Sequence, residues 1–233
     1  MRRDIGACLV CGESIQYFEK DREMICEFCG KPFTAKASCE QGHYVCDRCH
    51  SRQGIKVILD QCRESKARDP ILLAQAIMEN PYIHMHGPEH HVLVGAVLLT
   101  AYRNCGGDID LEKALGQMVE RGQKVPGGIC GFWGCCGAAV SSGMFVSIVT
   151  GSTPLAKEPW QLSNLMTSEA LKAIGELGGP RCCKRDSFTA IQAAVAFSKK
   201  HLGVAMELPL NIVCDFRKEN RQCIGKRCPY LKA

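Results

Sequence analysis

The spacing of the cysteines over the first fifty residues constrains this chain more than any other feature of its sequence. Three pairs have the form Cys-x2-Cys and a fourth has the form Cys-x3-His, and each pair can place two ligand atoms on one ion. A tetrahedral structural zinc takes two such pairs, so the spacing predicts two zinc ions. The predicted ligands are Cys8, Cys11, Cys26, Cys29, Cys39, His43, Cys46 and Cys49.

The order in which these pairs combine stays open at the level of sequence. The pairs can be used sequentially or in a cross-braced order, and the segment CEQGHYVCDRC resembles the Cys-His and Cys-x2-Cys half of RING-type modules. His50 is an alternative to His43, although His43 has the better spacing. Unpaired buried cysteines, or an iron–sulfur cluster on one ligand set, are the other interpretations.

Residues 1–52 are expected to form a domain of their own, a two-zinc cysteine-rich module. They show little helical periodicity and contain no apolar run long enough for a separate core. A segment of this size needs stabilisation beyond a hydrophobic core, and metal binding would supply its folding free energy.

The rest of the chain, residues 55–233, predicts a mostly α, helical domain. Apolar residues recur at spacings of three and four, with Asp, Ser, Thr or Pro near the start of each segment and Gly or Asn near the end. The segment 207–216 is the one candidate strand. The predicted helices cover residues 54–65, 69–80, 88–104, 110–122, 137–151, 167–179 and 186–203.

Composition indicates an ordinary globular protein with an unusual number of cysteines. The chain has 233 residues, of which 46% are hydrophobic and 23% charged, and it contains 17 cysteines. The basic start lacks an apolar signal region and no window reaches the length of a membrane span, so we expect a cytoplasmic protein with no membrane partner. In a reducing compartment, closely spaced cysteines are metal ligands or reactive thiols more often than disulfides. A net charge of +5 permits an anionic partner without demanding one, and nucleic acid binding stays open.

Four of the seven histidines cluster with a glutamate in the segment HMHGPEHH. Pro88 suits the first helical position, so Glu89 and the two histidines after it should lie in a first helical turn. The helix dipole there disfavours imidazolium, and neutral imidazole is the form that binds metal or accepts a proton. Glu89 is a candidate ligand or general base and His90 a candidate proton carrier; a hydrogen-bonded polar corner is the alternative. The candidate metal ligands are His84, His86, His90 and His91.

Further cysteines lie at two other predicted helix starts. Cys135 and Cys136 follow a glycine-rich segment that also holds Cys130, and Cys182 and Cys183 precede a helix that Asp186 or Ser187 could cap. The positive end of a helix dipole favours thiolate over thiol, so we expect these four paired cysteines to act as ligands or nucleophiles.

The carboxy-terminal segment carries Cys214, Cys223 and Cys228, the last followed by proline. Three thiolates with a fourth ligand from elsewhere could hold a 4Fe-4S cluster or a zinc ion, and absence of metal is the third interpretation.

Basic residues surround the cysteine pair at 182–183. Arg181, Lys184 and Arg185 are expected to bind an anion, because a guanidinium can hold a carboxylate or phosphate through two parallel hydrogen bonds. Pairing with Asp186 or Glu176 is the alternative, in which these residues bind nothing.

The motifs HGPEHH, PGGICGFWGCCGAA and GGPRCCKR, with GHYVCDRCH ahead of them, resemble a bacterial and archaeal family, common in anaerobes and catalogued as a domain of unknown function. The resemblance spans nearly the whole chain, with the front cysteine-rich element preceding the domain. It places the chain with these proteins and implies no particular reaction.

Three helix starts, at residues 84–91, 130–137 and 181–186, are therefore expected to converge on one site. Helix amino termini gathered around a point create a positive, donor-rich pocket. The leading hypothesis is a metal- or thiol-dependent enzyme that acts on a sulfur-containing or anionic small molecule. The second is a non-catalytic metalloprotein, an adaptor or cluster carrier whose zinc module binds a protein or RNA partner.

Overall fold

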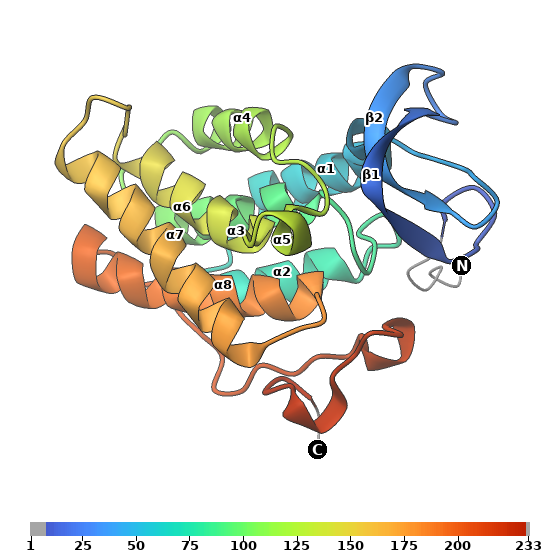
Figure 1. Ribbon diagram of the computed structural model, residues 1–233. Coiled ribbons are helices and arrows are strands. Elements are labelled where there is room, and N and C mark those ends of the chain that lie inside the picture. Colours follow the sequence, from blue (N-terminus) through green and yellow to red (C-terminus); the bar gives the residue numbers. More distant parts are fainter. Residues whose placement is uncertain (1–7, 232–233) are drawn as a thin grey trace.

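The computed structural model describes residues 8–231 and consists of a small β-ribbon beside a body of helices (Figure 1). Strand β1 (Ile15–Ile25) pairs antiparallel with β2 (Pro32–Cys39), and the register is interrupted between Tyr17 and Arg22. The mostly α fold with a small amino-terminal module is confirmed. The expectation about the basic start concerns residues 1–7, which lie outside the described residues.

Among residues 8–231, seven of the eight α-helices correspond to predicted segments, although the first begins at Asp47 instead of 54 and the seventh at Glu158 instead of 167; the fifth was not predicted. They are α1 (Asp47–Glu64), α2 (Pro70–Met78), α3 (His90–Asn104), α4 (Leu111–Gly122), α5 (Ile129–Phe132), α6 (Gly137–Val149), α7 (Glu158–Leu177) and α8 (Cys183–Phe197), followed by a π-helical turn, η1 (Ser198–Leu202), and two 3-10 turns, η2 (Arg217–Glu219) and η3 (Gly225–Arg227).

Helix α3 is the centre of the body. From Val92 to Tyr102 every residue is buried, and the helix packs against α1, α2, α4, α6 and α8. A helix that is apolar on all sides is stable only when neighbours surround it, because each buried large aliphatic side chain contributes roughly 1.5–3 kcal/mol. The run VLVGAVLL therefore determines which element becomes the core.

Helix starts in this body are fixed by side-chain caps. The carboxylate of Asp69 accepts hydrogen bonds from the backbone N–H groups of Ile71 and Leu72, and Pro70 occupies the first helical position of α2. Asp110 caps α4 in the same way through the N–H of Lys113. Such caps contribute about 1 kcal/mol each, and both were readable from the sequence.

Helix α1 connects the ribbon to the helical body. It begins at Asp47, inside the predicted amino-terminal module, and runs without a break to Glu64, past the expected boundary at residues 52–55. Whether residues 1–52 fold independently stays a prediction.

The segment 207–216 is not a strand, which corrects the sequence expectation. Its one β-bridge joins Cys214 to Leu231, and the segment otherwise runs as irregular chain across the body. Among residues 8–231 the one sheet is the β-ribbon of β1 and β2, at the upper right of Figure 1, and the segment pairs with neither strand. It is instead held by individual contacts, such as the hydrogen bond from Gln75 Nε2 to the Val213 carbonyl at 2.7 Å. Among the described residues, no helix combines the length and apolar character needed to cross a membrane.

Helix α6 consists largely of small residues, and α7 approaches its backbone closely at Gly143. A Cβ added there would lie 2.9 Å from the carbonyl oxygen of Ser163 and closer still to the side chain of Thr167. Gly116 in α4 is the opposite case, because a Cβ there would meet nothing within 4 Å.

These two glycines generate a matched prediction. Gly116→Ala should stabilise the protein by about 0.5–1 kcal/mol, because alanine has the better helix propensity and the space is open. Gly143→Ala should destabilise it despite the same gain, because the backbone of α7 has to move. Urea unfolding of both variants measures the difference; equal effects would contradict the packing between α6 and α7.

Candidate functional site

The eight predicted zinc ligands form two groups in the amino-terminal module. One contains Cys8, Cys11, Cys39 and His43, and the other contains Cys26, Cys29, Cys46 and Cys49; within each, the four ligand atoms lie within 4.8 Å of one another. The first and third pairs therefore combine, as do the second and fourth. Of the two arrangements left open by the sequence, the structure has the cross-braced one, with His43 rather than His50 in the first group.

The separations within each group suit a tetrahedral ion. The sulfurs of Cys11 and Cys39 are 3.8 Å apart, and those of Cys29 and Cys46 are 3.9 Å apart. A tetrahedron with zinc–sulfur bonds of about 2.3 Å has an edge of about 3.8 Å. Either group could therefore hold zinc without rearrangement.

Backbone turns prepare these sulfurs as ligands. The N–H of Cys46 donates to Cys26 Sγ at 3.3 Å, and the N–H of His43 donates to Cys39 Sγ at 3.3 Å. Burial alone would raise the pKa of both thiols, but N–H donors outweigh it and lower the pKa of Cys26 to about 6 and that of Cys39 to about 7. A thiolate is the form that binds metal.

The four histidines of the 84–91 segment do not gather at one point. Nδ1 of His90 lies 3.1 Å from the Gly87 carbonyl, and Nδ1 of His91 lies 3.1 Å from the Val125 carbonyl. Consecutive helical residues point about 100° apart, so these two rings face different neighbours. Of the four, only His84 belongs to a ligand group with Glu89, and its partner there is His50 from α1.

Burial lowers the pKa of three of these imidazoles, whereas the sequence expectation for His90 and His91 rested on the helix dipole. Burial lowers the pKa of His86 to about 4, aided by the positive charge of Arg181, and it lowers the pKa of His90 well below the usual value. Burial would also raise the pKa of Glu89, but the nearby imidazoles of His50, His90 and His84 reverse this and lower it to about 2. Glu89 is therefore a carboxylate with no exposed surface.

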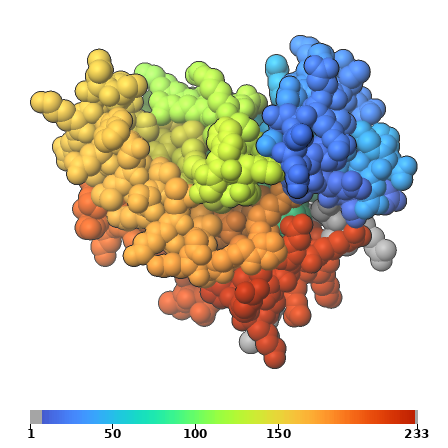
Figure 2. Space-filling model, in the orientation of Figure 1, coloured from blue at the N-terminus to red at the C-terminus, as the bar shows by residue number. Residues whose placement is uncertain are grey.

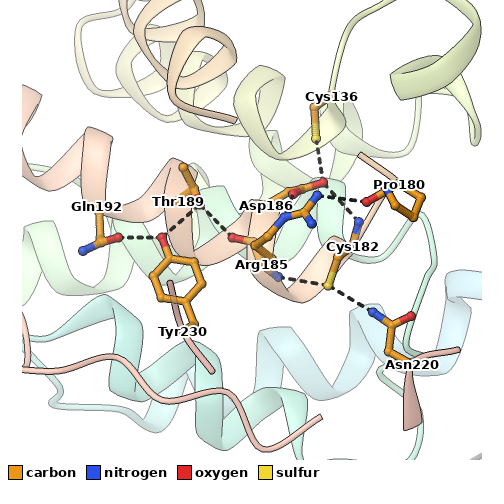
Figure 3. Close-up of polar contacts among 9 residues, drawn as sticks. All are labelled: Cys136, Pro180, Cys182, Arg185, Asp186, Thr189, Gln192, Asn220 and Tyr230. Atoms are coloured by element: carbon orange, nitrogen blue, oxygen red, sulfur yellow. Dashed lines mark hydrogen bonds and ion pairs between the residues drawn. The ribbon is translucent and has the colours of Figure 1, made fainter. Parts of the chain in front are cut away.

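The starts of α6 and α8 meet at the carboxylate of Asp186 (Figure 3). The thiol of Cys136 donates to Asp186 Oδ2 at 3.9 Å, and the backbone N–H of Cys182 donates to the same oxygen at 3.4 Å. The cap of α8 is the sulfur of Cys182, which accepts from the N–H of Arg185 at 3.5 Å; Asp186 lies in the first turn instead of capping it. Cysteines about fifty positions apart thus share one acid.

The three basic residues around Cys182 and Cys183 have different environments. Arg185 donates through Nε to Asp186 Oδ1 at 3.0 Å and through Nη2 to the Pro180 carbonyl at 3.0 Å, while its buried Nη1 has no partner (Figure 3). The guanidinium of Arg181 lies 5.3 Å over the ring of Tyr17. Lys184 is fully buried and donates to the Ile83 carbonyl at 3.2 Å, so its expected role in anion binding is not supported.

A pocket of about 690 Å³ opens beside this network. In Figure 2 the residues around 128–134, in yellow-green, meet the blue amino-terminal module above the orange helices. The pocket is mostly apolar and carries a few polar groups, which is typical of small-molecule sites. Its lining includes Tyr17, Gly128, Cys130, Phe132, Cys136, Ile174, Pro180, Arg181, Arg185 and Asp186.

The pocket does not include the histidine segment. His90 and Glu89 are buried under α1 and α3 and are absent from its lining, as is Cys135. The three helix starts are nevertheless adjacent: the ring of His91 lies against Gly137, and burial of Cys183 is accompanied by a hydrogen bond with the backbone of Gly87. The segments converge, and only two of them line the cavity.

Burial outweighs the helix dipole at these thiols, contrary to the sequence expectation. It raises the pKa of Cys136 to about 12, with the charge of Asp186 acting in the same direction. It also raises the pKa of Cys183 and Cys182. These cysteines are therefore thiols at neutral pH, because a dipole of half a charge does not compensate a dry environment and a nearby carboxylate.

The tail cysteines do not form a single-ion site of the kind seen in the amino-terminal module. Cys214, Cys223 and Cys228 are absent from the ligand groups found among residues 8–231. Burial raises the pKa of Cys214 to about 11. The charge of the neighbouring Cys182 raises it further, by more than the charges of Cys223 and Cys228 do. Asn220 of the tail donates to Cys182 Sγ at 3.4 Å, so Cys182 is the thiol that the tail approaches.

Sequence reasoning missed several participants. Asp186 was considered as a cap and as an ion-pair partner of the basic residues, but not as the acid shared by two cysteines. Tyr17 lies in β1 far along the chain, and Asn220 lies in an irregular segment. His50 follows Cys49 directly and was considered only as a substitute for His43. One signal in the sequence could have pointed to His50. Once His43 is the fourth ligand of the first cysteine group, His50 has no assigned role there.

Comparison with known proteins gives a family and no activity. A model of a family of unknown function matches residues 58–231. The chain belongs to that family, DUF5714. The amino-terminal metal groups precede the matched region, whereas the pocket, Asp186 and the tail lie within it, apart from Tyr17. No curated protein and no solved structure matches the chain.

The cross-braced pairing predicts the outcome of double substitutions. Cys8→Ser with Cys39→Ser should lower the wild-type ion count by one, because both ligands belong to the same group. Cys8→Ser with Cys26→Ser should weaken both sites. Native mass spectrometry after zinc reconstitution counts the ions; sequential pairing would give the opposite pattern.

Cys136 should react slowly with iodoacetamide. With a pKa of about 12, its thiolate fraction at pH 8 is about 10⁻⁴, and the rate should rise about tenfold per pH unit because deprotonation increases with pH. Cys105 is also partly exposed, and its Sγ donates to the Arg68 carbonyl at 3.7 Å, so it is the internal control. Peptide mass spectrometry over time measures both rates; rapid labelling of Cys136 at pH 7 would contradict the buried thiol.

Proposed function

We propose that the protein is a zinc-stabilised, thiol-dependent enzyme whose pocket binds an anionic or sulfur-containing small molecule. The observation that carries the proposal is the pocket of about 690 Å³, into which Cys130, Cys136, Arg181, Arg185 and Asp186 all contribute surface. An adaptor or cluster carrier would not need a cavity that combines thiols, a carboxylate and two guanidinium groups.

The arginines are suited to recognition of the anion. Nη1 of Arg185 is buried and has no hydrogen-bond partner, and leaving a buried charged donor unpaired costs more than 1 kcal/mol. An anionic group at the pocket wall would satisfy it. Arg181 has no carboxylate partner among the described ion pairs, and the ring of Tyr17 orients it from the opposite side.

Cys136 and Asp186 are suited to proton transfer. The thiol already points to Asp186 Oδ2, and burial raises the pKa of that carboxylate, which makes it a better base. Because the resting group is the thiol, Oδ2 is placed to take the proton from Sγ as the sulfur attacks, so no free thiolate has to form first. Cys130 supplies a second thiol in the same lining.

The metals in this proposal have structural roles. Zinc in the two amino-terminal groups holds the β-ribbon, which has few buried apolar side chains, and thereby places Tyr17 against Arg181. The tail cysteines with Cys182 could hold a 4Fe-4S cluster or a second type of metal ion, and no reaction step proposed here depends on it.

A protein partner for the zinc module is the second candidate function. Ile25 and Phe28 lie in the module with 66% and 56% of their surface exposed, which is unusual for large apolar side chains in so small a unit. The double variant Ile25→Ser, Phe28→Ser should then lose binding of the protein partner in a pull-down assay, while its zinc content stays unchanged.

Substitution of Arg181 tests the pocket directly. A calorimetric screen against phosphate, sulfate, small carboxylates and aminothiols should find a ligand, and Arg181→Ala should weaken it by about 10- to 100-fold because one charge-assisted hydrogen bond is lost. The exposed Arg103→Ala is the matched control and should bind as the wild type does. Equal affinity in Arg181→Ala and the control would refute anion recognition by this residue.

Arg185 is expected to give a different result. Because its side chain is buried and paired with Asp186, Arg185→Ala should destabilise the fold by about 3–5 kcal/mol as well as weaken binding. Thermal unfolding of Arg181→Ala and Arg185→Ala separates the two roles: a similar melting temperature for both would contradict the structural role of Arg185.

A further inference from the structure

A third group of metal-ligand side chains lies outside both zinc groups and outside the pocket. It consists of His50 at the start of α1, His84 in the loop before α3, and Glu89 at the start of α3, with the three ligand atoms within 4.8 Å of one another. We infer that His50, His84 and Glu89 form a third metal centre, for a divalent transition metal ion, at the junction of the zinc module and the helical body.

The distance between His50 and Glu89 favours a bridging ion over a direct contact. His50 Nδ1 lies 3.5 Å from Glu89 Oε2, and neither buried atom has a hydrogen-bond partner. A direct N–H···O bond would be about 2.7–3.2 Å long. The edge of a tetrahedron with metal–ligand bonds of about 2.1 Å is about 3.4 Å, so one ion placed between these atoms would satisfy both.

The surroundings hold the carboxylate in place. Its other oxygen, Oε1, accepts a hydrogen bond from the backbone N–H of His84 at 2.8 Å, which leaves Oε2 for the ion. Gly87 lies against the carboxylate so closely that any Cβ there would collide with both oxygens. A Cβ on Gly54 of α1 would lie 2.7 Å from the Tyr82 carbonyl, so α1 is packed tightly on the same loop. Such outer contacts orient metal ligands and raise affinity.

The ligand set indicates the type of centre. Two imidazoles and one carboxylate suit zinc or ferrous iron, and a structural zinc site normally has four protein ligands whereas a catalytic one has three. Residues 8–231 supply three. Glu89 is fully buried, while His50 retains 20% of its side-chain exposure, so the His50 side of the group lies nearer to the surface than the carboxylate does.

The centre would join two parts of the chain. His50 precedes the region that matches the family, which begins at residue 58, whereas His84 and Glu89 lie inside it. The helical body therefore lacks the full ligand set without the start of α1, and the Cys46 and Cys49 ligands at that same start position His50.

Cobalt reconstitution tests the centre in the full chain. Apo-protein is loaded anaerobically with Co²⁺, the ions are counted by mass spectrometry, and the near-ultraviolet thiolate-to-cobalt band reports the cysteine groups. His84→Ala and Glu89→Gln should each bind one Co²⁺ fewer than the wild type with an unchanged thiolate band. Any ion held by the tail cysteines adds equally to all counts.

Two controls make the result decisive. His201 also has a buried ring nitrogen without a partner but belongs to no ligand group, so His201→Ala should retain the wild-type count. Arg181→Ala should retain it too, because the pocket is separate. Equal counts in all variants would overturn the inference, as would loss of the thiolate band in His50→Ala, which would make His50 a ligand of a cysteine group.

Azide tests the open position. It should shift the visible cobalt bands of the wild type and leave those of Glu89→Gln unchanged, because only the three-ligand centre has a position for an added anion. A wild-type spectrum insensitive to azide at full Co²⁺ loading would overturn the open coordination.

Discussion

The burial of α3 from Val92 to Tyr102 is the constraint on which the rest of the structure depends. A helix start normally exposes unpaired N–H groups and polar side chains to water, but here that start is inside the protein. Glu89 and His90 have almost no exposed surface, so their polar atoms need partners from other segments. The loop before α3 and the start of α1 supply contacts for these two residues, and the carbonyl of Val125 pairs with the neighbouring His91. Polar side chains gather at this helix start because water cannot reach it, so each buried polar group has to contact another polar group of the protein.

The zinc module and the helical body are coupled through α1. The residues that begin this helix include ligands of the second cysteine group, and one turn later the helix packs on the loop that carries Glu89. Metal binding in the module therefore affects the position of His50. The same module presents Tyr17 to Arg181 at the pocket. A change in metal content can in this way alter two sites that contain no shared ligand.

Asp186 has a similar linking role on the other side of α3. It joins the start of α6, the start of α8 and the guanidinium of Arg185, and the last of these lines the pocket. A buried carboxylate with these contacts is costly to remove, because it would leave a charged partner without compensation. In the proposed function, Arg185 would serve both stability and ligand recognition, which is why Arg181 is the cleaner probe of binding.

Local features were predictable from the sequence. The helices follow from apolar spacing, the caps at Asp69 and Asp110 from residue type, and the metal-ligand pairs from turns of four or five residues. Each depends on neighbours within a few positions, which the sequence displays directly. Cross-braced pairing, the partnership of His50 with Glu89, and the burial that keeps Cys136 protonated depend on segments up to fifty or more positions apart. Only the tertiary structure decided these, because packing, and not chain proximity, determines which polar groups lose water together.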